Sequence, residues 1–365
     1  MKIFLTAIAL IAVVSISAQE SDSTLTDIEK SFRDSIAALN LENDILAQSQ
    51  ELYNQGIESY KAGQFAAAVG HFSEALKLNP VMLQSYYNRG VSYFSMDNFD
   101  DAVKDFSKVL EMDESHYNAL FQRGLCRYSS GNLAEAIGDF MEAHIADPLK
   151  VDPDYQLGTC YFLLGKYDES IKHFSNCITI NNKKPDYYND RGSAYRMKGD
   201  YPSAVRDYEK ALALDDDLAY VKNNLGSVKK LMGDPNGAII SYDYATLADG
   251  NYHIAHNNKG VVLCEQGKYE DGLKSFDRAI AGDKTYSIAY NNRGAVKFKL
   301  EYYKEAVKDF NEAIKLDPNY MNAYVNRGIA REMSRDQKGA CSDWKKADEL
   351  GSSAGRKFYI NNCND

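Results

Sequence analysis

The sequence contains no cluster of lysine and arginine residues. Its 42 basic residues are outnumbered by 52 acidic ones, which gives a formal net charge of -10 at pH 7. A nucleic-acid-binding protein needs grouped cations to neutralise phosphates. Nucleic acids and other polyanions are therefore not expected as partners.

Long apolar runs are absent after the first eighteen residues. Residues 3–14 are almost all apolar, and small residues follow up to Ala18. A membrane-spanning helix needs about 20 apolar residues, so this shorter run predicts a secretory signal peptide, residues 1–18, cleaved after Ala18. Cleavage removes Lys2 and changes the net charge from -10 to -10 - 1 = -11. No cysteine follows the run, so no lipid anchor is expected, and no later segment predicts a transmembrane helix.

The composition and the predicted cleavage site are typical of an exported bacterial protein. Only 7 prolines occur in 365 residues, and the predicted cleavage site reads Ala-Gln. We expect an exported protein, periplasmic or extracellular, from a Gram-negative host.

Motifs for catalysis are also missing. The sequence has no nucleophile elbow, no glycine loop for phosphates and no metalloprotease motif. His253 and His256 are three residues apart, but a metal site needs more ligands and no third one is evident. We therefore expect no enzymatic activity, no cofactor and no metal.

Glycines recur every 34 residues without insertion, and sixteen residues after each comes an aromatic residue. The glycines are Gly56, Gly90, Gly124, Gly158, Gly192, Gly226, Gly260, Gly294 and Gly328. The aromatic residues are Phe72, Phe106, Phe140, Phe174, Tyr208, Tyr242, Phe276, Phe310 and Trp344. Glycine inside a helix costs about 1 kcal/mol relative to alanine, so its recurrence indicates close contact between two helices.

Each 34-residue unit is also interrupted twice. Gly63 lies near the middle of the first unit and Pro80 near its end, and both residue types stop helices. Each unit is therefore predicted to be two helices joined by a turn, a hairpin too small to bury its own apolar face.

This pattern resembles the tetratricopeptide repeat. With each unit numbered from seven residues before its periodic glycine, the family signature is met by glycine at position 8, small residues at 20 and 27, and the aromatic residue at 24. The resemblance covers residues 49–352. It implies an all-α fold, a right-handed superhelical α-solenoid of nine helix-turn-helix repeats, with a concave groove and a role in protein–protein interaction.

Arginine at position 7 and aspartate at position 23 occur together in five repeats. The pairs are Arg89 and Asp105, Arg123 and Asp139, Arg191 and Asp207, Arg293 and Asp309, and Arg327 and Asp343. We expect ion pairs that join the two helices and fix their register. A row of anion-binding arginines is the weaker alternative, because each arginine has its own carboxylate.

Two positions are predicted to line the groove. Position 5 is Tyr53, Tyr87, Phe121 and Tyr155, then Asn189, Asn223, Asn257 and Asn291, and finally Val325. Position 6 is Asn54, Asn88, Gln122, Gln156, Asp190, Asn224, Asn258, Asn292 and Asn326. An amide has both a donor and an acceptor and so complements a peptide backbone, and the row resembles the asparagine ladder of O-linked N-acetylglucosamine transferases.

Both rows have structural alternatives. The amides at position 6 can instead bond to a neighbouring helix, and aromatic residues at helical spacing are often packing residues. The abrupt change at position 5 between the fourth and fifth repeats is what favours a binding role, with the aromatic half taking apolar side chains.

The ends of the chain are predicted to close the stack. Residues 19–48 contain an amphipathic helix at 26–47, with Ile28, Phe32, Ile36, Leu39 and Leu46 on one side. We expect it to cap the first hairpin; the alternative is a dimerising or docking helix. Residues 353–365 form a capping tail.

Four of the six cysteines form two pairs with different expected roles. Cys126 and Cys160 occupy position 10 of consecutive repeats, and equivalent packed helices lie about 8–10 Å apart, too far for a disulfide. Both are predicted to be core residues. Cys341 and Cys363 are the candidates for a disulfide, which would attach the tail to the last hairpin.

The sequence as a whole predicts a non-catalytic scaffold that binds an extended peptide or protein in its groove. An architectural subunit of an envelope complex, assembled through the convex face and the N-terminal helix, is the main alternative. Glycan binding by the aromatic half is a remote one.

Overall fold

The computed structural model describes residues 22–363, and every regular element among them is an α-helix. The predicted signal peptide, residues 1–18, lies outside the described residues. None of the described helices combines the length and the apolar character that a membrane span requires. The chain divides after Pro148 into two compact units.

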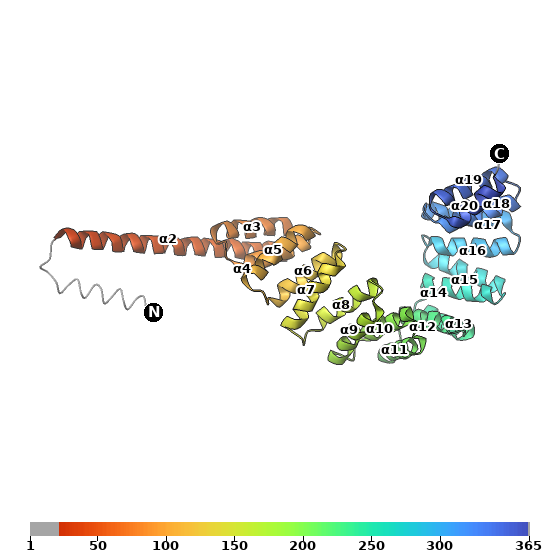
Figure 1. The fold of residues 1–365 in the computed structure, drawn as a ribbon, viewed down its shortest axis with the longest axis horizontal. Helices are drawn as coiled ribbons and strands as arrows, with labels where there is room; N and C mark the ends of the chain where they lie inside the picture. Colours follow the sequence, from red (N-terminus) through yellow and green to blue (C-terminus); the bar gives the residue numbers. More distant parts are fainter. Residues whose placement is uncertain (1–21, 364–365) are drawn as a thin grey trace. The chain divides into compact units, whose positions relative to one another are not determined.

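The helices of each unit appear in Figure 1. The first unit contains α2 (Asp22–Lys61), α3 (Phe65–Leu78), α4 (Leu83–Phe94), α5 (Phe99–Met112), α6 (Tyr117–Ser129) and α7 (Leu133–Ala146). The second unit contains α8 (Val151–Leu163), α9 (Tyr167–Ile180), α10 (Pro185–Lys198), α11 (Tyr201–Leu214), α12 (Ala219–Leu231), α13 (Pro235–Ala248), α14 (His253–Glu265), α15 (Tyr269–Gly282), α16 (Ser287–Lys299), α17 (Tyr303–Leu316), α18 (Met321–Met333), α19 (Gln337–Glu349) and α20 (Ser353–Asn362).

The helices form hairpins in the predicted 34-residue register. In each hairpin the aromatic ring at position 24 lies against the glycine at position 8, so that a Cβ atom on Gly124 would lie 2.6 Å from Cε1 of Phe140. Phe72, Phe106 and Phe140 are fully buried. The close approach of two backbones around one ring is therefore the structural reason for the periodic glycine.

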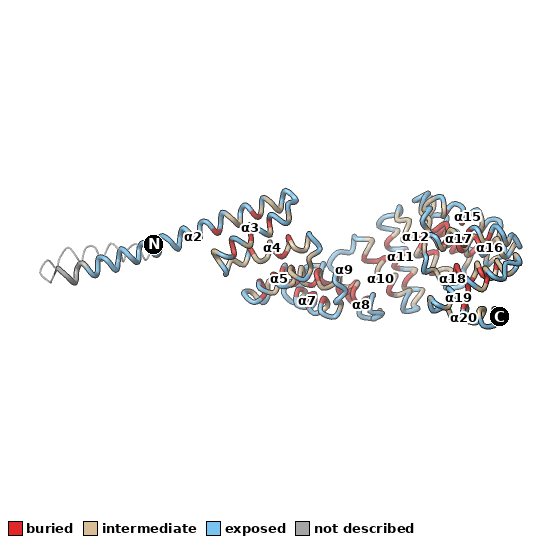
Figure 2. The backbone as a smooth tube through the Cα atoms, turned by 90° about the horizontal axis from the view of Figure 1, so that it is seen from above, coloured by how far each residue is buried: buried red, intermediate tan, exposed pale blue. Residues whose placement is uncertain are grey.

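The N-terminal helix differs from the prediction. The sequence predicts a separate helix at residues 26–47 that caps the first hairpin. This prediction is wrong, because α2 is one continuous helix that also forms the first helix of repeat one. Ile28, Ile36 and Leu39 are 43–55% exposed, so they cover nothing. Figure 2 shows this part of α2 as exposed backbone ahead of α3.

The C-terminal tail closes the last hairpin. In α20 the ring of Phe358 stacks on Trp344 at 5.2 Å between centroids, and Arg356 Nε donates to Asp348 Oδ1 at 2.9 Å. Cys341 and Cys363 form a disulfide. The tail is therefore held to α19 by an apolar contact, a charged hydrogen bond and a covalent bond.

Candidate functional site

Within each unit the first helices of successive repeats contact one another in a row, which we call the inner row. In the second unit, α10, α12, α14 and α16 each contact the next first helix as well as their own partner, and α18 contacts α20 of the tail. Positions 5 and 6, which are predicted to line the groove, both lie on these helices. A ligand held by the row would therefore contact consecutive repeats at the same positions.

The asparagines of this row bond to one another between repeats. The Nδ2 of position 6 donates to the Oδ1 of position 5 in the preceding repeat, and all four distances are 3.0 Å: Asn224 to Asn189, Asn258 to Asn223, Asn292 to Asn257, and Asn326 to Asn291. The acceptors are at most 8% exposed. These four asparagines are therefore buried between helices, which corrects the placement of Asn189, Asn223, Asn257 and Asn291 on the groove surface.

The series ends at Asp190, the one carboxylate at position 6. The hydroxyl of Tyr155 donates to Asp190 Oδ2 at 2.8 Å, and Asn189 Nδ2 donates to Oδ1 at 3.0 Å. Burial raises the pKa of Asp190, although both hydrogen bonds lower it. Asp190 thus joins the asparagine series to the aromatic series.

The other position 6 residues have fewer contacts of this kind. Asn88 Nδ2 donates to the Tyr53 hydroxyl at 3.0 Å, which repeats the bond between neighbours in the first unit. Asn54 is exposed and accepts from Gln50 at 3.1 Å. Gln122 and Gln156 are half-buried.

The aromatic residues at position 5 pack within their own hairpins. Each ring lies 5.7–5.8 Å from the position 24 ring: Tyr53 on Phe72, Tyr87 on Phe106, Phe121 on Phe140, and Tyr155 on Phe174. All four are half-buried. They extend the core toward the inner surface and leave part of each ring available there.

All five predicted arginine–aspartate pairs lie within hydrogen-bonding distance. The Nη2-to-carboxylate distances are 2.6–2.7 Å for Arg89 with Asp105, Arg123 with Asp139, Arg191 with Asp207, Arg293 with Asp309, and Arg327 with Asp343. Each Nη1 also donates to position 25 of the preceding repeat, as Arg191 does to Ser175 at 3.0 Å. One guanidinium therefore connects three helices of two repeats.

Burial makes these pairs costly as well as specific. Hydrogen bonding to Asp105 raises the pKa of Arg89, so the guanidinium stays charged. Desolvation nevertheless raises the pKa of Asp105, which shows that burial outweighs the pairing at the carboxylate. The pairs therefore fix register more than they add stability.

A second cation on some of these aspartates was not predicted. Arg127 and Arg331 Nη1 bind Asp139 and Asp343 at 2.7 and 2.8 Å, and Lys297 binds Asp309 at 2.8 Å. All three are at position 11, one helical turn after the arginine. The sequence alone could have indicated these second cations, because each lies four residues after the arginine of its pair.

Repeat four replaces the arginine pair with another buried one. Position 7 is Leu157, and His173 at position 23 places Nδ1 2.7 Å from Asp154 Oδ1. Asp154 is fully buried and also accepts from Asn176 at 3.0 Å. A polar link between the two helices is therefore kept with different residues.

Two adjoining hollows lie along the inner row of the second unit. The first, of about 350 Å³, is lined by Tyr155, Thr159, Phe162, Phe174, Asp190, Ser193, Arg196 and Asn224. The second, of about 250 Å³, is lined by Arg196, Ser227, Lys230, Leu231, Tyr242, Asn258 and Val261. Arg196 belongs to both, and its buried Nε has no hydrogen-bond partner in the described chain.

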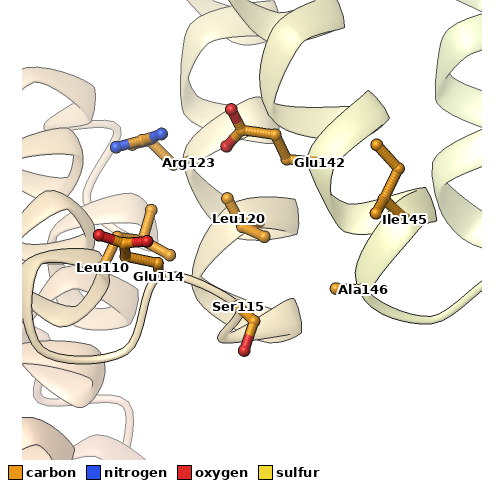
Figure 3. A pocket seen from close by; sticks show the side chains of 8 residues that line it. All are labelled: Leu110, Glu114, Ser115, Leu120, Arg123, Glu142, Ile145 and Ala146. Atoms are coloured by element: carbon orange, nitrogen blue, oxygen red, sulfur yellow. The ribbon is translucent and has the colours of Figure 1, made fainter.

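The first unit has a larger hollow in another place. Its volume is about 400 Å³, and it lies among α5, α6 and α7 (Figure 3). Leu110, Leu120 and Ile145 form its apolar lining, with Glu114 and Glu142 beside them. None of its lining residues is at position 5 or 6, so it does not form part of the predicted groove.

The cysteines and histidines considered in the sequence have surroundings typical of packing residues and not of a reactive or metal site. Cys126 and Cys160 are fully buried free thiols, and burial raises the pKa of Cys126 to about 12. His256 Nε2 lies 3.1 Å from the Gly250 carbonyl oxygen, and burial lowers its pKa. His253 packs edge-on against Tyr286 at 4.8 Å. Within residues 22–363, no three acidic, histidine or cysteine residues group as metal ligands would.

Family models agree with the repeat geometry. Models described as tetratricopeptide repeat match residues 53–95, 84–116, 152–217 and 287–320. The chain belongs to the tetratricopeptide repeat family. Its repeats are protein-interaction modules, and the chain is a scaffold of that kind. The comparison with curated proteins gives no match.

Solved tetratricopeptide repeat structures share the solenoid fold. A tetratricopeptide repeat protein from Parabacteroides merdae is 20% identical with a TM-score of 0.54, and the match covers 69% of this chain and all of that one. The Pseudomonas aeruginosa pilF protein is 18% identical with a TM-score of 0.50, covering 57% and 96%. The Cut9–Hcn1 structure of the APC/C is 13% identical with a TM-score of 0.53, covering 87% and 76%. At these identities the likeness concerns the fold alone.

Proposed function

We propose that the chain is non-catalytic and binds an extended segment of another polypeptide along the inner helices of repeats four to six. The observation that carries this is the pair of adjoining hollows that share Arg196. Its Nε is buried without a partner, and a buried donor left unsatisfied costs about 1–3 kcal/mol. A ligand that accepts this hydrogen bond would recover that energy.

The lining indicates which side chains such a segment would contain. Phe162 and Phe174 make one wall of the first hollow apolar, which suits an apolar or aromatic side chain. Arg196 and Lys230 line the second hollow, and Lys230 also pairs with Glu265 at 2.8 Å. An acidic or amide side chain next to the apolar one would meet this charge.

The asparagine ladder has a supporting role in this proposal. The position 6 asparagines of repeats six to nine each use one N–H between repeats, as Asn258 does toward Asn223, and keep a second. The ladder therefore fixes the spacing of the inner helices, and backbone binding by the remaining N–H groups stays a prediction.

Crosslinking inside the cell tests the binding surface. A photoreactive residue at Ser193, which lines the first hollow, should capture a polypeptide, while one at the exposed Lys172 of α9 should not. Arg196→Ala should reduce capture from Ser193 at least fivefold. Capture from Lys172 but not from Ser193 would contradict the proposal.

We also propose that the chain works outside the cytoplasm. The apolar residues 3–14 and the Cys341–Cys363 disulfide support this, because disulfides persist in oxidising compartments. N-terminal sequencing of the protein from its native cells should begin at Gln19. Recovery of the chain from the cytoplasm with Met1 and free Cys341 would contradict it.

A further inference from the structure

The outer face of repeat six is apolar. Ile240, Tyr244 and Leu247 are spaced by four and three residues on α13, so they lie on one side of the helix. They are 52%, 56% and 81% exposed, whereas Tyr242 on the other side of α13 is buried. Three neighbouring apolar side chains in water are a marker of an interaction surface. We call these three residues the α13 stripe.

The other repeats show that the solenoid does not require this stripe. The residues at position 22 are Gly70, Lys104, Gly138, Lys172, Arg206, Lys274, Lys308 and Ser342 in the eight other repeats. Those at position 26 are Glu74, Lys108, Glu142, Asn176, Lys210, Arg278, Glu312 and Lys346. None of these is a large apolar residue. Position 29, where Leu247 lies, is large and apolar in one other repeat, as Ile145 of repeat three. The combination of all three apolar positions is therefore specific to repeat six.

Cations flank the stripe on both sides in the repeat register. Arg206 and Lys210 occupy positions 22 and 26 of α11, and Lys274 and Arg278 occupy them on α15; all four are exposed. Lys274 and Arg278 also line a hollow of about 310 Å³ together with Ile239 of α13. Arg278 pairs with no carboxylate in the part of the chain that the structure describes. The face therefore suits an apolar helix with acidic ends.

The N-terminal part of α2 has that composition. Ile28, Phe32, Ile36, Leu39 and Leu46 form an exposed stripe, about 27 Å long at 1.5 Å per residue. The segment from Asp22 to Leu46 has six acidic and two basic residues, a net charge of -6 + 2 = -4. Asp27 and Glu29 lie toward one end of the stripe, and Glu42 and Asp44 toward the other.

We propose that α2 of one copy binds the α13 stripe of a second copy. The apolar stripes cover each other, and the acidic ends of α2 meet the cations of α11 and α15. Pairing of two α2 helices would instead bring together two segments that each carry -4. Because the two surfaces differ, the contact is head-to-tail, and further copies can add to each end.

Sedimentation velocity of the full chain tests this contact. The sedimentation coefficient should rise with protein concentration. The variant I240R/Y244K/L247A gives α13 the residues of α11 at those positions, and F32K/L39K changes only exposed residues of α2. Each variant alone should sediment as a monomer, with self-association at least tenfold weaker.

Mixing the two variants identifies the geometry. The α13 variant keeps α2 and the α2 variant keeps the stripe, so a 1:1 mixture should form a heterodimer and nothing larger. A native chain that is monomeric throughout, association that persists in either variant, or a mixture without a complex would each overturn the proposal. Val81→Lys, at a site 76% exposed, is the matched control and should associate like the native chain.

Charge reversal gives a second test that does not depend on apolar residues. K274E/R278E should weaken association, and mixing it with E42K/D44K should restore it. Failure of the mixture to recover would contradict the contact. The inner helices take no part, so loss of the partner captured from Ser193 would leave this result unchanged.

Discussion

At the scale of single residues, the periodic glycines decide how closely two helices approach. A Cβ on Gly226 would lie 2.7 Å from Cε1 of Tyr242 and 3.1 Å from the carbonyl oxygen of Ala238. A methyl group has no space there, so the glycine is required by packing and not by backbone conformation. Gly70 and Gly138, which also lie inside helices, have no atom within 4 Å of an added Cβ.

Repeat three contains one glycine of each kind, Gly124 packed against a ring and Gly138 in open space, so two substitutions test the packing explanation. Gly124→Ala should lower the free energy of unfolding by about 2 kcal/mol, because the steric clash of the new methyl group with Phe140 outweighs the higher helix propensity of alanine. Gly138→Ala, with no atom within 4 Å of the added Cβ, should raise it by about 0.5–1 kcal/mol. Urea denaturation of both variants measures this; equal effects would refute the packing explanation.

The arginine pairs predict non-additive mutations. Arg191→Leu alone leaves Asp207 buried without its partner and should cost about 3–5 kcal/mol. Adding Asp207→Ser copies Leu225 and Ser241 of repeat six and should recover most of that loss. A double-mutant cycle by chemical denaturation checks this, and additive losses would mean that the pair is not coupled.

Asp190 predicts a pH dependence. Burial raises its pKa in the folded chain, so its contribution favours folding below the unfolded-state pKa and is lost as pH rises through the folded-state pKa. Asp190→Asn, the common residue of this position, should therefore add about 1 kcal/mol of stability at pH 7. The gain should disappear near pH 3. Unfolding curves at both pH values test this, and a gain that grows at low pH would contradict it.

At the scale of elements, every hairpin turn uses the same backbone conformation. Position 15 has positive φ in all nine repeats, with glycine in six and Asp97, Glu301 and Arg335 in three. A left-handed residue ends the first helix, and a side chain there costs about 1–2 kcal/mol.

Glu301→Gly should therefore stabilise repeat eight by about 1 kcal/mol. Its side chain is exposed and its φ is 64°, so no contact is lost. Hydrogen exchange of α16 and α17 would show the gain as slower exchange. Faster exchange would mean that the Glu301 side chain contributes a contact of its own.

Repetition made the hairpins, the glycine–aromatic packing and the arginine–aspartate pairs predictable, because nine copies of one environment reveal which positions vary together. The continuous α2 was missed although no proline or glycine separates Asp22 from Gln55. The direction of the asparagine bonds was not predictable, since an amide fits a neighbour and a ligand equally well. In the folded chain Asn257 is only 4% exposed, because the neighbouring first helix covers it.

At the scale of the molecule, the main contacts of each helix within a unit are with helices one or two places away in the chain. Stability in such an array is a sum of local terms, so damage at one end stays local. The last hairpin is the clearest case, because the Cys341–Cys363 bond closes it within a loop of 22 residues.

Cys341→Ser should destabilise the end of the chain by about 3 kcal/mol without affecting distant repeats. Hydrogen exchange should accelerate in α19 and α20 and stay unchanged in α10 to α13. Reduction of the native protein should reproduce the pattern. Faster exchange throughout α10 to α13 would show long-range cooperativity instead.

The asparagine bonds also have an evolutionary consequence. From Asn189 to Asn326 the donor and acceptor recur with one sequence offset of 35 residues, so gene duplication or loss of one whole repeat in this block would leave every bond intact. Duplication of the repeat that contains Tyr155 or Asp190 would not preserve the bonds in the same way. Asp190 accepts from the Tyr155 hydroxyl of the preceding repeat and from Asn189 of its own, so it needs a tyrosine, not an asparagine, before it. Chains descended from this one can therefore change in length among repeats five to nine, while the junction between repeats four and five stays fixed.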